Sequence, residues 1–502
     1  MICISVLALI VLQYPQFARD PGVGWHLKTG EYVSIFNHVP SFDPFLFSTV
    51  KRPWISDQWL ADLVLFKTFQ VGSWPLLYGL LTVVFIATFW GILFQFARKE
   101  SHSTFAAVLA TFLSFKMAQV HFILRPVLFG ILFFSIAYCL VFLAYKKRAH
   151  QYLYLLPVVF MIWANMHGSF VFGLILICLG LLAVFVDQIR EFGSDTLSLS
   201  QIYSELRPFL YALIFSVFAC CLNPYGIKLF EHLLNLGSSD FFMKLHEEWL
   251  SPDFREVAPK MFLYSISIIL LANSVVGRPL LSSFDFVVLL VFSFLFLEMV
   301  RVLPFVAVVT IVPLASSLSQ LGAAAIFKQY RSLDRLKSFF SLLDQRELDT
   351  LKPKVVLLFL SLSVLYGSFK GAVPFYSGEY GPERDKFPYA ALVFLTAKQR
   401  TLGSNPEGVV SVPEWGGFIT LRGEEMLKPI IDDRNTLLGE DFYKEYLKSM
   451  KPYRSWRLFV EDVGARYVLL PSASLLAQDI AKASNYNRIY DDPISVIYER
   501  VS

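Results

Sequence analysis

Asp20 is the residue whose position most clearly indicates chemistry, because it directly follows the first apolar run of the chain, residues 1–17. That run lacks the basic start and the A-x-A-like cleavage site of a signal peptide, so we expect a short first membrane helix. A carboxylate just beyond it lies at the membrane–water boundary, where it can take a proton from a hydroxyl group. We predict that Asp20 is a general base; the alternative is a solvated charge that sets the depth of the helix.

The polar, aromatic-rich segment 18–73 holds three further candidates for substrate binding. His26 could bind a phosphate, and Glu31 is a second carboxylate in the segment. Trp25 is equally typical of an interfacial aromatic belt and of a platform for a sugar ring. Asp57, by contrast, is expected to cap a helix that runs through QWLADLVLF.

Other candidates lie far along the chain. Arg125, His167 and Arg301 stand near the ends of apolar runs, and Glu248 lies in the second long polar segment, 223–260, where a solvated loop is the alternative. Arginine suits a phosphate because its planar guanidinium offers a fork of donors. Arg301 also stands three residues after Glu298, so the two could form a structural ion pair on one helix face. Nearby ligand types could hold a divalent metal, but no spacing demands one, and the metal site stays unknown.

The composition requires a bilayer around most of the chain. Of 502 residues, 55% are hydrophobic and only 17% are charged, against roughly 25% charged in average soluble proteins. The mean hydropathy is +0.54. A soluble globule of this size could not bury so much apolar surface, and the same figures exclude disorder, coiled coils and nucleic-acid binding.

Apolar runs predict a mainly α, polytopic membrane helix bundle of about eleven spans within residues 1–371. After the first run they lie near 74–97, 104–122, 126–145, 152–166, 168–187, 208–222, 261–276, 284–300, 302–319 and 354–371. The long segments 18–73 and 223–260 then form loops on one side.

Residues 372–502 are polar and predict a small C-terminal α/β domain. We expect a strand followed by a Gly-Gly turn in GVVSVPEWGGFITL and a second strand in KPIIDDR. A helix and a strand follow in SWRLFVEDVGARYVLLP, and ISVIYERV is the last strand.

The placement of Lys and Arg predicts the orientation. With a cytoplasmic N-terminus, the inside turns are compactly basic, as in Arg98-Lys99 and Lys146-Lys147-Arg148. Segment 18–73 and the C-terminal domain are then extracytoplasmic, as expected for an integral membrane protein with this orientation.

The first loop resembles that of polytopic bacterial proteins of the GT-C glycosyltransferase superfamily, in a subgroup with a D-x4-W-H-x-x-T-G-E motif. The pattern begins at Asp20 and continues through Trp25-His26 and Thr29-Gly30-Glu31. Further matches, spread over nearly the whole chain, are Val39-Pro40, Asp43-Pro44-Phe45, Phe47-Ser48, Arg52-Pro53-Trp54, Trp59-Leu60, Asn165-Met166-His167-Gly168, Asn223-Pro224, Glu248-Trp249, Ser251-Pro252-Asp253, Arg301 with Pro304, Trp415-Gly416-Gly417, Asp432-Asp433-Arg434 and residues 464–471.

This resemblance implies a membrane transferase that takes a sugar from a polyprenyl-phosphate donor, with an acidic residue of the first loop, here Asp20, as base or metal ligand. Two features depart from known members. Asp20 is followed by Pro21 rather than by a second acidic residue, and the WWDYG motif of oligosaccharyltransferases is absent.

We therefore expect a hexosyl or pentosyl transfer to a glycan, lipid or protein acceptor of the cell envelope. Asp20 is the expected base, and His26, Arg125 and Arg301 are candidates to hold the departing phosphate. Two alternatives stay open. One is a transporter or flippase of lipid-linked sugars, although no internal repeat supports it. The other is a non-catalytic scaffold for envelope polysaccharide assembly.

Overall fold

The structure is a computed structural model. It describes residues 20–48, 51–192, 199–245, 247–323, 353–373, 380–403, 405–434, 437–451 and 455–501, together with residues 335, 338 and 342. The first apolar run lies outside these residues, and so does the short membrane helix predicted there.

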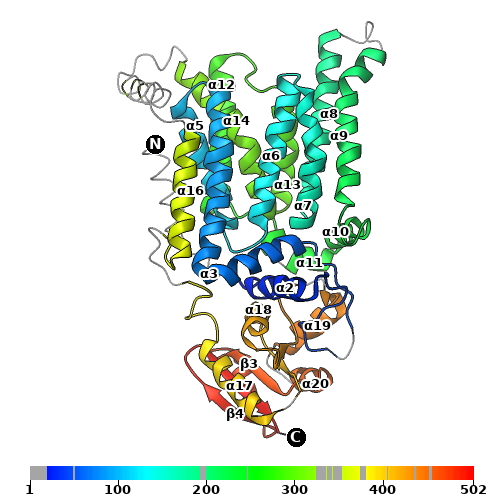
Figure 1. The fold of residues 1–502 in the computed structure, drawn as a ribbon, viewed down its shortest axis with the longest axis vertical. Helices are drawn as coiled ribbons and strands as arrows, with labels where there is room; N and C mark the ends of the chain where they lie inside the picture. The colour runs from blue at the N-terminus through cyan, green and yellow to red at the C-terminus, as the bar shows by residue number, and fades with distance from the viewer. Residues whose placement is uncertain are drawn as a thin grey trace.

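Two helices connect Asp20 to the bundle. α2 (Val23–Phe36) lies across one end of the bundle (Figure 1). α3 (Trp59–Ile86) is broken at Gly72 and Ser73, whose backbones are not helical, just before Pro75. The segment before the break packs beside α2, and the segment after it continues through η2 (Ala87–Leu93) into α4 (Phe94–Ser101). The break therefore separates a helix that supports the first loop from one that stands in the bundle.

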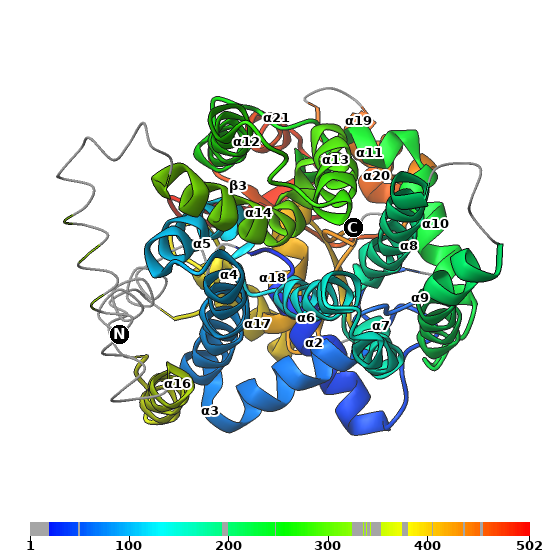
Figure 2. The same cartoon turned by 90° about the horizontal axis from the view of Figure 1, so that it is seen from above.

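The remaining long helices run side by side with α3 (Figures 1 and 2). They are α5 (Thr104–Ala118), α6 (Val127–Lys146), α7 (Leu156–Met166), α8 (Phe170–Phe192), α9 (Leu199–Cys220), α12 (Val257–Val276), α13 (Ser283–Glu298), α14 (Leu303–Ala323) and α16 (Pro353–Phe369). Each of the ten apolar runs after the first coincides with one of these elements.

Six of the helices in the described residues are long and apolar enough to cross a membrane. They are Trp59–Ser101, Val127–Lys146, Phe170–Arg190, Ser200–Cys220, Val257–Val276 and Val300–Gly322. The predicted helical membrane bundle is thus confirmed, while the figure of eleven spans stays a prediction.

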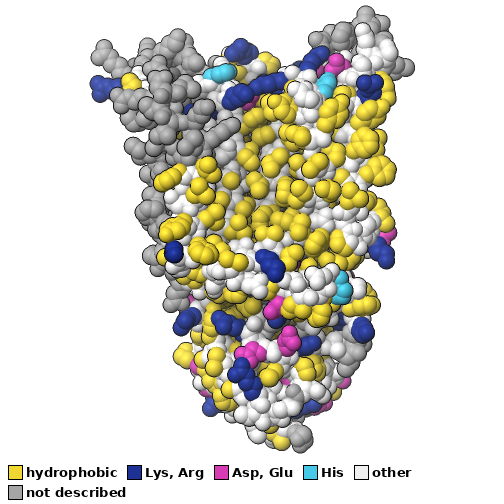
Figure 3. Space-filling view, viewed as in Figure 1, with side chains coloured by type: hydrophobic (Ala, Val, Ile, Leu, Met, Phe, Trp, Pro, Cys, Tyr) yellow, Lys and Arg dark blue, Asp and Glu magenta, His cyan; other side chains and the backbone are white. Residues whose placement is uncertain are grey.

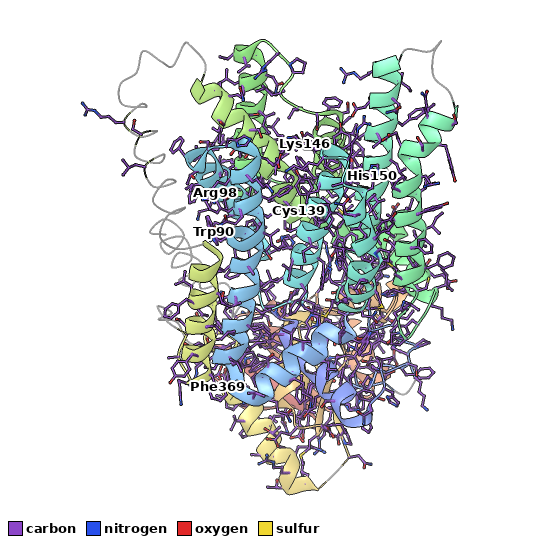
Figure 4. All side chains as sticks on the ribbon, turned by 45° about the horizontal axis from the view of Figure 1, so that its top comes forward. Trp90, Arg98, Cys139, Lys146, His150 and Phe369 are labelled. Carbon is purple, nitrogen blue, oxygen red and sulfur yellow. The ribbon has the colours of Figure 1, made fainter. Side chains whose placement is uncertain are left out.

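The bundle is apolar both inside and outside. Trp90, Tyr138 and Trp163 are among its largest fully buried side chains, and Figure 4 shows Trp90 and Cys139 within it. On its outer surface Phe215 and Phe218 remain 58% and 67% exposed. Figure 3 shows such side chains as a continuous apolar band. A surface of this kind is stable only when lipid, rather than water, surrounds it.

Shorter elements connect the helices. They are η3 (Gln119–His121), η4 (His150–Leu155), α10 (Lys228–Ser238), α11 (Asp240–Leu245), η5 (Glu247–Trp249) and η6 (Val300–Val302). One prediction proves wrong here. Glu298 and Arg301 do not share a helix face, because α13 ends at Glu298 and Met299 is extended. Glu298 is exposed, and Arg301 pairs with Glu248 instead.

The C-terminal region is an α/β unit below the bundle (Figure 1). Its five-stranded sheet has the order β2-β1-β3-β5-β4, with β1 parallel to β2 and β3, and β5 antiparallel to β3 and β4. Its elements are α17 (Tyr389–Leu402), β1 (Glu407–Val410), α18 (Pro413–Arg422), β2 (Leu427–Pro429), α19 (Glu440–Ser449), α20 (Ser455–Asp462), β3 (Tyr467–Pro471), α21 (Leu475–Ile480), β4 (Tyr486–Asp491) and β5 (Ser495–Arg500).

The α/β prediction is confirmed in class and wrong in one detail. The strands expected in KPIIDDR, RYVLLP and ISVIYERV are present. The expected Gly-Gly turn is not a turn, because Gly416 and Gly417 lie inside α18 and are buried. That helix packs against α2, so tertiary contact outweighs the poor helix propensity of glycine.

Candidate active site

Asp20 is buried at the start of α2, with 3% of its surface exposed. Its Oδ1 accepts from the backbone N–H of Gly22 at 3.1 Å and from Nε of Arg125 at 2.6 Å. Its Oδ2 has no hydrogen-bond partner in the described part of the chain. Burial raises the pKa of Asp20, and the charge of Arg125 opposes that shift. Asp20 is therefore not a solvated surface charge; it is a fixed carboxylate with one oxygen unused.

Arg125 holds three carboxylates at once. It lies in the turn between η3 and α6, where Pro126 starts the helix. Besides Asp20, its Nη1 lies 3.4 Å from Oε1 of Glu248, and its Nη2 lies 3.2 Å from Oδ2 of Asp433. These charges raise the pKa of Arg125 further above its usual value. One guanidinium thus joins the first loop, the second loop and the C-terminal region.

Arg301 supplies a second guanidinium on the far side of Glu248. Its Nη1 lies 3.8 Å from Oε2 of Glu248, and its guanidinium stands over the Trp249 ring at 5.2 Å. Both partners come from η5, so this short helix brings a carboxylate and an aromatic face to the same cation. The two arginines are therefore bridged by Glu248.

Asp433 is a third carboxylate at Arg125; the sequence places it in the Asp432-Asp433-Arg434 match but does not single it out as a site residue. It follows β2, accepts from Trp25 Nε1 at 2.8 Å and approaches Arg125. Burial, together with the neighbouring Asp432 and Asp20, raises its pKa to about 7, against the lowering effect of Arg125. The carboxyl group of Asp433 consequently changes charge near neutral pH.

Glycines allow the C-terminal region to come this close. A Cβ added to Gly24 would lie 1.9 Å from the backbone oxygen of Gly417, and one added to Gly417 would lie 2.4 Å from that of Pro21. Neither position has room for a side chain. The close packing of α2 on α18 places Asp433 beside Trp25.

A buried arginine, Arg434, holds the junction between the first loop and the C-terminal region. Arg434 lies 2.8 Å from Oδ1 of Asp43 and 2.6 Å from Oδ2 of Asp432. Its guanidinium also stands 4.5 Å from the centre of the Trp54 ring and 5.6 Å from that of Trp25. Arg434 holds the first loop and the segment that carries Asp433 in one arrangement.

Two histidines lie beside the carboxylate cluster, which consists of Asp20, Glu248 and Asp433 around Arg125. His26 lies with its Nδ1 2.6 Å from Asp62 and its ring 3.6 Å from that of Trp25. Burial lowers its pKa well below the usual value. His167 and Ser169 contact each other at 2.8 Å, and burial lowers the pKa of His167 to about 3. These imidazoles are neutral near pH 7.

His121, at the end of η3, is a further residue that the sequence did not single out. It is 7% exposed, and neither ring nitrogen has a hydrogen-bond partner in the described chain. Burial lowers its pKa to about 4, and the nearby charges that act on it are Glu248, Arg301 and Arg125. A neutral imidazole with two unused nitrogens thus lies near Glu248 and the two arginines.

The structure brings most, but not all, of the predicted residues together. Trp25 and Arg301 each contact a carboxylate held by Arg125, and His26 and His167 lie at the border. Glu31 is elsewhere and pairs with Lys28 on α2. The cap expected from Asp57 is wrong: α3 begins at Trp59, and its N-cap position has no side-chain hydrogen bond.

With Asp433 ionised, the cluster contains an excess of negative charge. Asp20, Glu248 and Asp433 oppose Arg125 and Arg301, and the neighbouring imidazoles are neutral. Among the described residues, no group of three His, Cys, Asp or Glu side chains could hold a metal ion, and Arg125 already holds the three carboxylates. What these side chains can do themselves is accept a proton at Asp20 and bind an oxyanion at the arginines.

Solved structures share this fold. The Archaeoglobus fulgidus oligosaccharyltransferase in the apo form has a TM-score of 0.55 at 13% identity, over 94% of this chain and 69% of that chain. AglB from the same organism, in complex with an inhibitory peptide and a dolichol-phosphate, gives 0.57 at 13% over the same shares. ArnT from Cupriavidus metallidurans in the apo state gives 0.51 at 13%, over 99% and 96%.

No family model matches the chain, and no curated protein matches it. At these identities the likeness to solved structures shows the fold alone. The predicted fold, a membrane helix bundle with a small C-terminal α/β region, is therefore confirmed in outline. Membership of the GT-C superfamily and of the subgroup defined by the first-loop motif stays a prediction.

Proposed function

We propose that this protein is an integral membrane glycosyltransferase that moves a sugar from a polyprenyl-phosphate donor to an acceptor of the cell envelope. The observation that carries the proposal is the pairing of Asp20, whose Oδ2 is unused, with Arg125 at the end of an apolar bundle. The archaeal oligosaccharyltransferase of the same fold, which is in complex with a dolichol-phosphate, supports a lipid phosphate as the donor group.

The proposed reaction is a single displacement at the anomeric carbon. The acceptor oxygen forms the new bond to that carbon while the bond to the phosphate oxygen breaks. Asp20 accepts the hydroxyl proton, and the phosphate leaves with the electron pair. Arg125 and Arg301 stabilise the negative charge that grows on the phosphate. Each guanidinium can donate two parallel N–H bonds to phosphate oxygens.

The environment of Asp20 suits this role. Its raised pKa makes the carboxylate a stronger base than an exposed aspartate. Its Oδ1 stays fixed by Gly22 and Arg125, so Oδ2 has a defined direction. The first loop thus provides the base, and the two arginines come from turns at the same end of the bundle.

In the proposed orientation this end faces the outside of a bacterial plasma membrane. The opposite end carries the basic residues Arg98, Lys146 and Lys147, and Figure 4 shows Arg98 and Lys146 there together with His150. A basic end is typical of the cytoplasmic side. The C-terminal region and the site are then extracytoplasmic, where membrane lipid, lipid-linked sugar and envelope acceptor meet.

Asp20→Asn tests the proposal. With purified protein in nanodiscs and a panel of radiolabelled polyprenyl-phosphate sugars, we expect release of sugar from the lipid to fall about 10²- to 10⁴-fold, the usual contribution of a general base. Asp441→Asn, an exposed aspartate at the start of α19, is the matched control and should keep full activity.

Two results would contradict the proposal. One is normal sugar transfer by the Asp20→Asn protein, which would exclude the assigned base. The other is movement of intact lipid-linked sugar across the membrane of proteoliposomes without any product, which would favour a flippase.

A further inference from the structure

A pocket of about 420 Å³ lies at the end of α2 that is remote from Asp20. It is open to the surface and is lined by the last turns of α2, the loop after it, Trp59 and Pro224. α2 contains 14 residues, so at 1.5 Å per residue the pocket is about 20 Å from Asp20. It is a separate site and not an extension of the carboxylate cluster.

Aromatic rings form part of its wall. The rings of Tyr32 and His38 stack with centroids 5.5 Å apart, and Trp59 lines the pocket with them. Trp59 is fixed, because its Nε1 donates to Oδ1 of Asn165 at 2.9 Å. The hydroxyl of Tyr225 binds the backbone of Pro40 and Ser56, which holds the loop after α2 in place.

Polar side chains in the same pocket have unused hydrogen-bonding capacity. Within the described residues, the side chains of Tyr32, Asn37 and Ser41 make no hydrogen bond. Asn37 ends α2 in the left-handed conformation, with φ 54°. Among the residues that the structure describes, no Asp, Glu, Lys or Arg lines the pocket. Its chemistry therefore suits a neutral ligand with many hydroxyl groups rather than a phosphate.

The pocket also lies where the apolar bundle ends. Asn165, which holds Trp59, is in the last turn of α7. Beside the pocket, Ile35 and Phe36 on the last turn of α2 are 62% and 57% exposed, and Phe42 in its wall is 48% exposed. Exposed apolar side chains at this level fit the boundary between lipid and water.

We propose that this pocket binds the pyranose ring of a neutral saccharide. A sugar ring has apolar C–H faces and polar edges, which match stacked aromatic rings and free amide and hydroxyl groups. The ring belongs either to a membrane-anchored glycan or to a free envelope glycan, and both share this chemistry. The inference concerns binding and holds whether or not Asp20 is the base.

Binding of methyl β-D-glucopyranoside and methyl N-acetyl-β-D-glucosaminide to nanodisc-embedded protein, followed by saturation-transfer NMR, tests the proposal. The variant Asn37→Gly with Ser41→Ala removes two hydrogen-bonding side chains and keeps the left-handed backbone at residue 37. We expect its affinity to fall roughly 25-fold, the loss that corresponds to two hydrogen bonds.

His102→Gly is the matched control, because His102 also ends a helix with a left-handed backbone and lies outside the pocket. It should bind the glycosides like the unaltered protein, and so should Asp20→Asn. A preference for octyl glucoside over the methyl glycoside assigns the pocket to membrane-anchored glycans; equal affinity assigns it to free glycans. Unchanged affinity in the double variant, or equal competition by octan-1-ol, would overturn the proposal.

Discussion

The proposed function predicts that Asp433 competes with the donor phosphate for Arg125. Its Oδ2 lies 3.2 Å from Nη2 of Arg125. A phosphate that binds this arginine has to share it with, or displace, the carboxylate of Asp433. Asp433→Asn removes that negative charge and keeps the shape, and the amide oxygen can still accept from Trp25 Nε1. We expect the variant to bind polyprenyl phosphate more tightly at alkaline pH.

The magnitude follows from the separation of the two charges. A phosphate paired with Arg125 would lie about 6 Å from the carboxylate of Asp433, given ordinary hydrogen-bond lengths on both sides of the guanidinium. With an effective dielectric constant of about 20 to 40, the repulsion is about 1.4 to 2.8 kcal/mol. The expected gain in affinity is thus about tenfold to hundredfold.

The effect depends on pH because burial raises the pKa of Asp433 to about 7. Below that value the carboxyl group of Asp433 is mostly neutral, and the protein and its variant should bind the phosphate equally. Above it the protein carries the extra charge and binds more weakly. The phosphate itself gains its second charge at about pH 6, which increases the same repulsion, so both titrations raise the ratio of the two dissociation constants as pH rises.

Calorimetry with a short-chain polyprenyl phosphate between pH 5.5 and 8.5 measures this ratio. The ratio should be close to one at the acid end and should rise through pH 7. Asp441→Asn should bind like the unaltered protein throughout. A ratio that stays constant over the whole range would refute the assignment of Asp433 as a competitor for Arg125.

Three further outcomes follow from the same junction. Gly24→Ala should push α2 away from Gly417 and lower the rate of sugar transfer about 100-fold, as expected for a displacement of about 1 Å at an active site. Gly237→Ala is the control for activity, because its added Cβ meets open space. Arg434→Met should lower the free energy of unfolding by about 3 to 5 kcal/mol, measured by denaturation in detergent, because two buried carboxylates lose their partner; a loss below about 1 kcal/mol would contradict this. Between about pH 4 and pH 7 the carboxyl group of Asp433 keeps its proton in the folded protein, whereas the unfolded chain releases it, because folding raises the pKa of this group. The melting temperature of the unaltered protein should therefore fall relative to that of Asp433→Asn as pH rises through this range.

Much of the bundle and part of the site could be predicted from the sequence because both depend on local apolar patterns. Every apolar run from residue 74 onward coincides with a helix. The ends of those runs place Arg125, Glu248 and Arg301 in connections on the side of the first loop. Connections at the same end of a helix bundle lie close together, so contact among these three residues does not depend on the exact packing of each helix.

Other contacts left no signal in the local pattern. His121 falls inside the apolar run 104–122 and looks like part of a span, although the α-helix ends at Ala118. Asp433 belongs to a polar IIDDR segment typical of any strand end. Its approach to Arg125 joins residues 308 positions apart, and nothing in the spacing along the chain encodes a contact over that distance.

The charge balance of the cluster explains why the C-terminal region matters to the proposed chemistry. Three carboxylates surround Arg125, and only Arg301 adds a second positive charge. A phosphate cannot simply join this arrangement, because each added negative charge meets carboxylates already in place. In the proposed reaction the donor phosphate therefore either shares Arg125 with these carboxylates or draws Glu248 or Asp433 away from it, while Asp20 stays held by the backbone of Gly22. Since Asp433 sits on the C-terminal region, we expect occupancy of the donor site to loosen the contact between that region and α2.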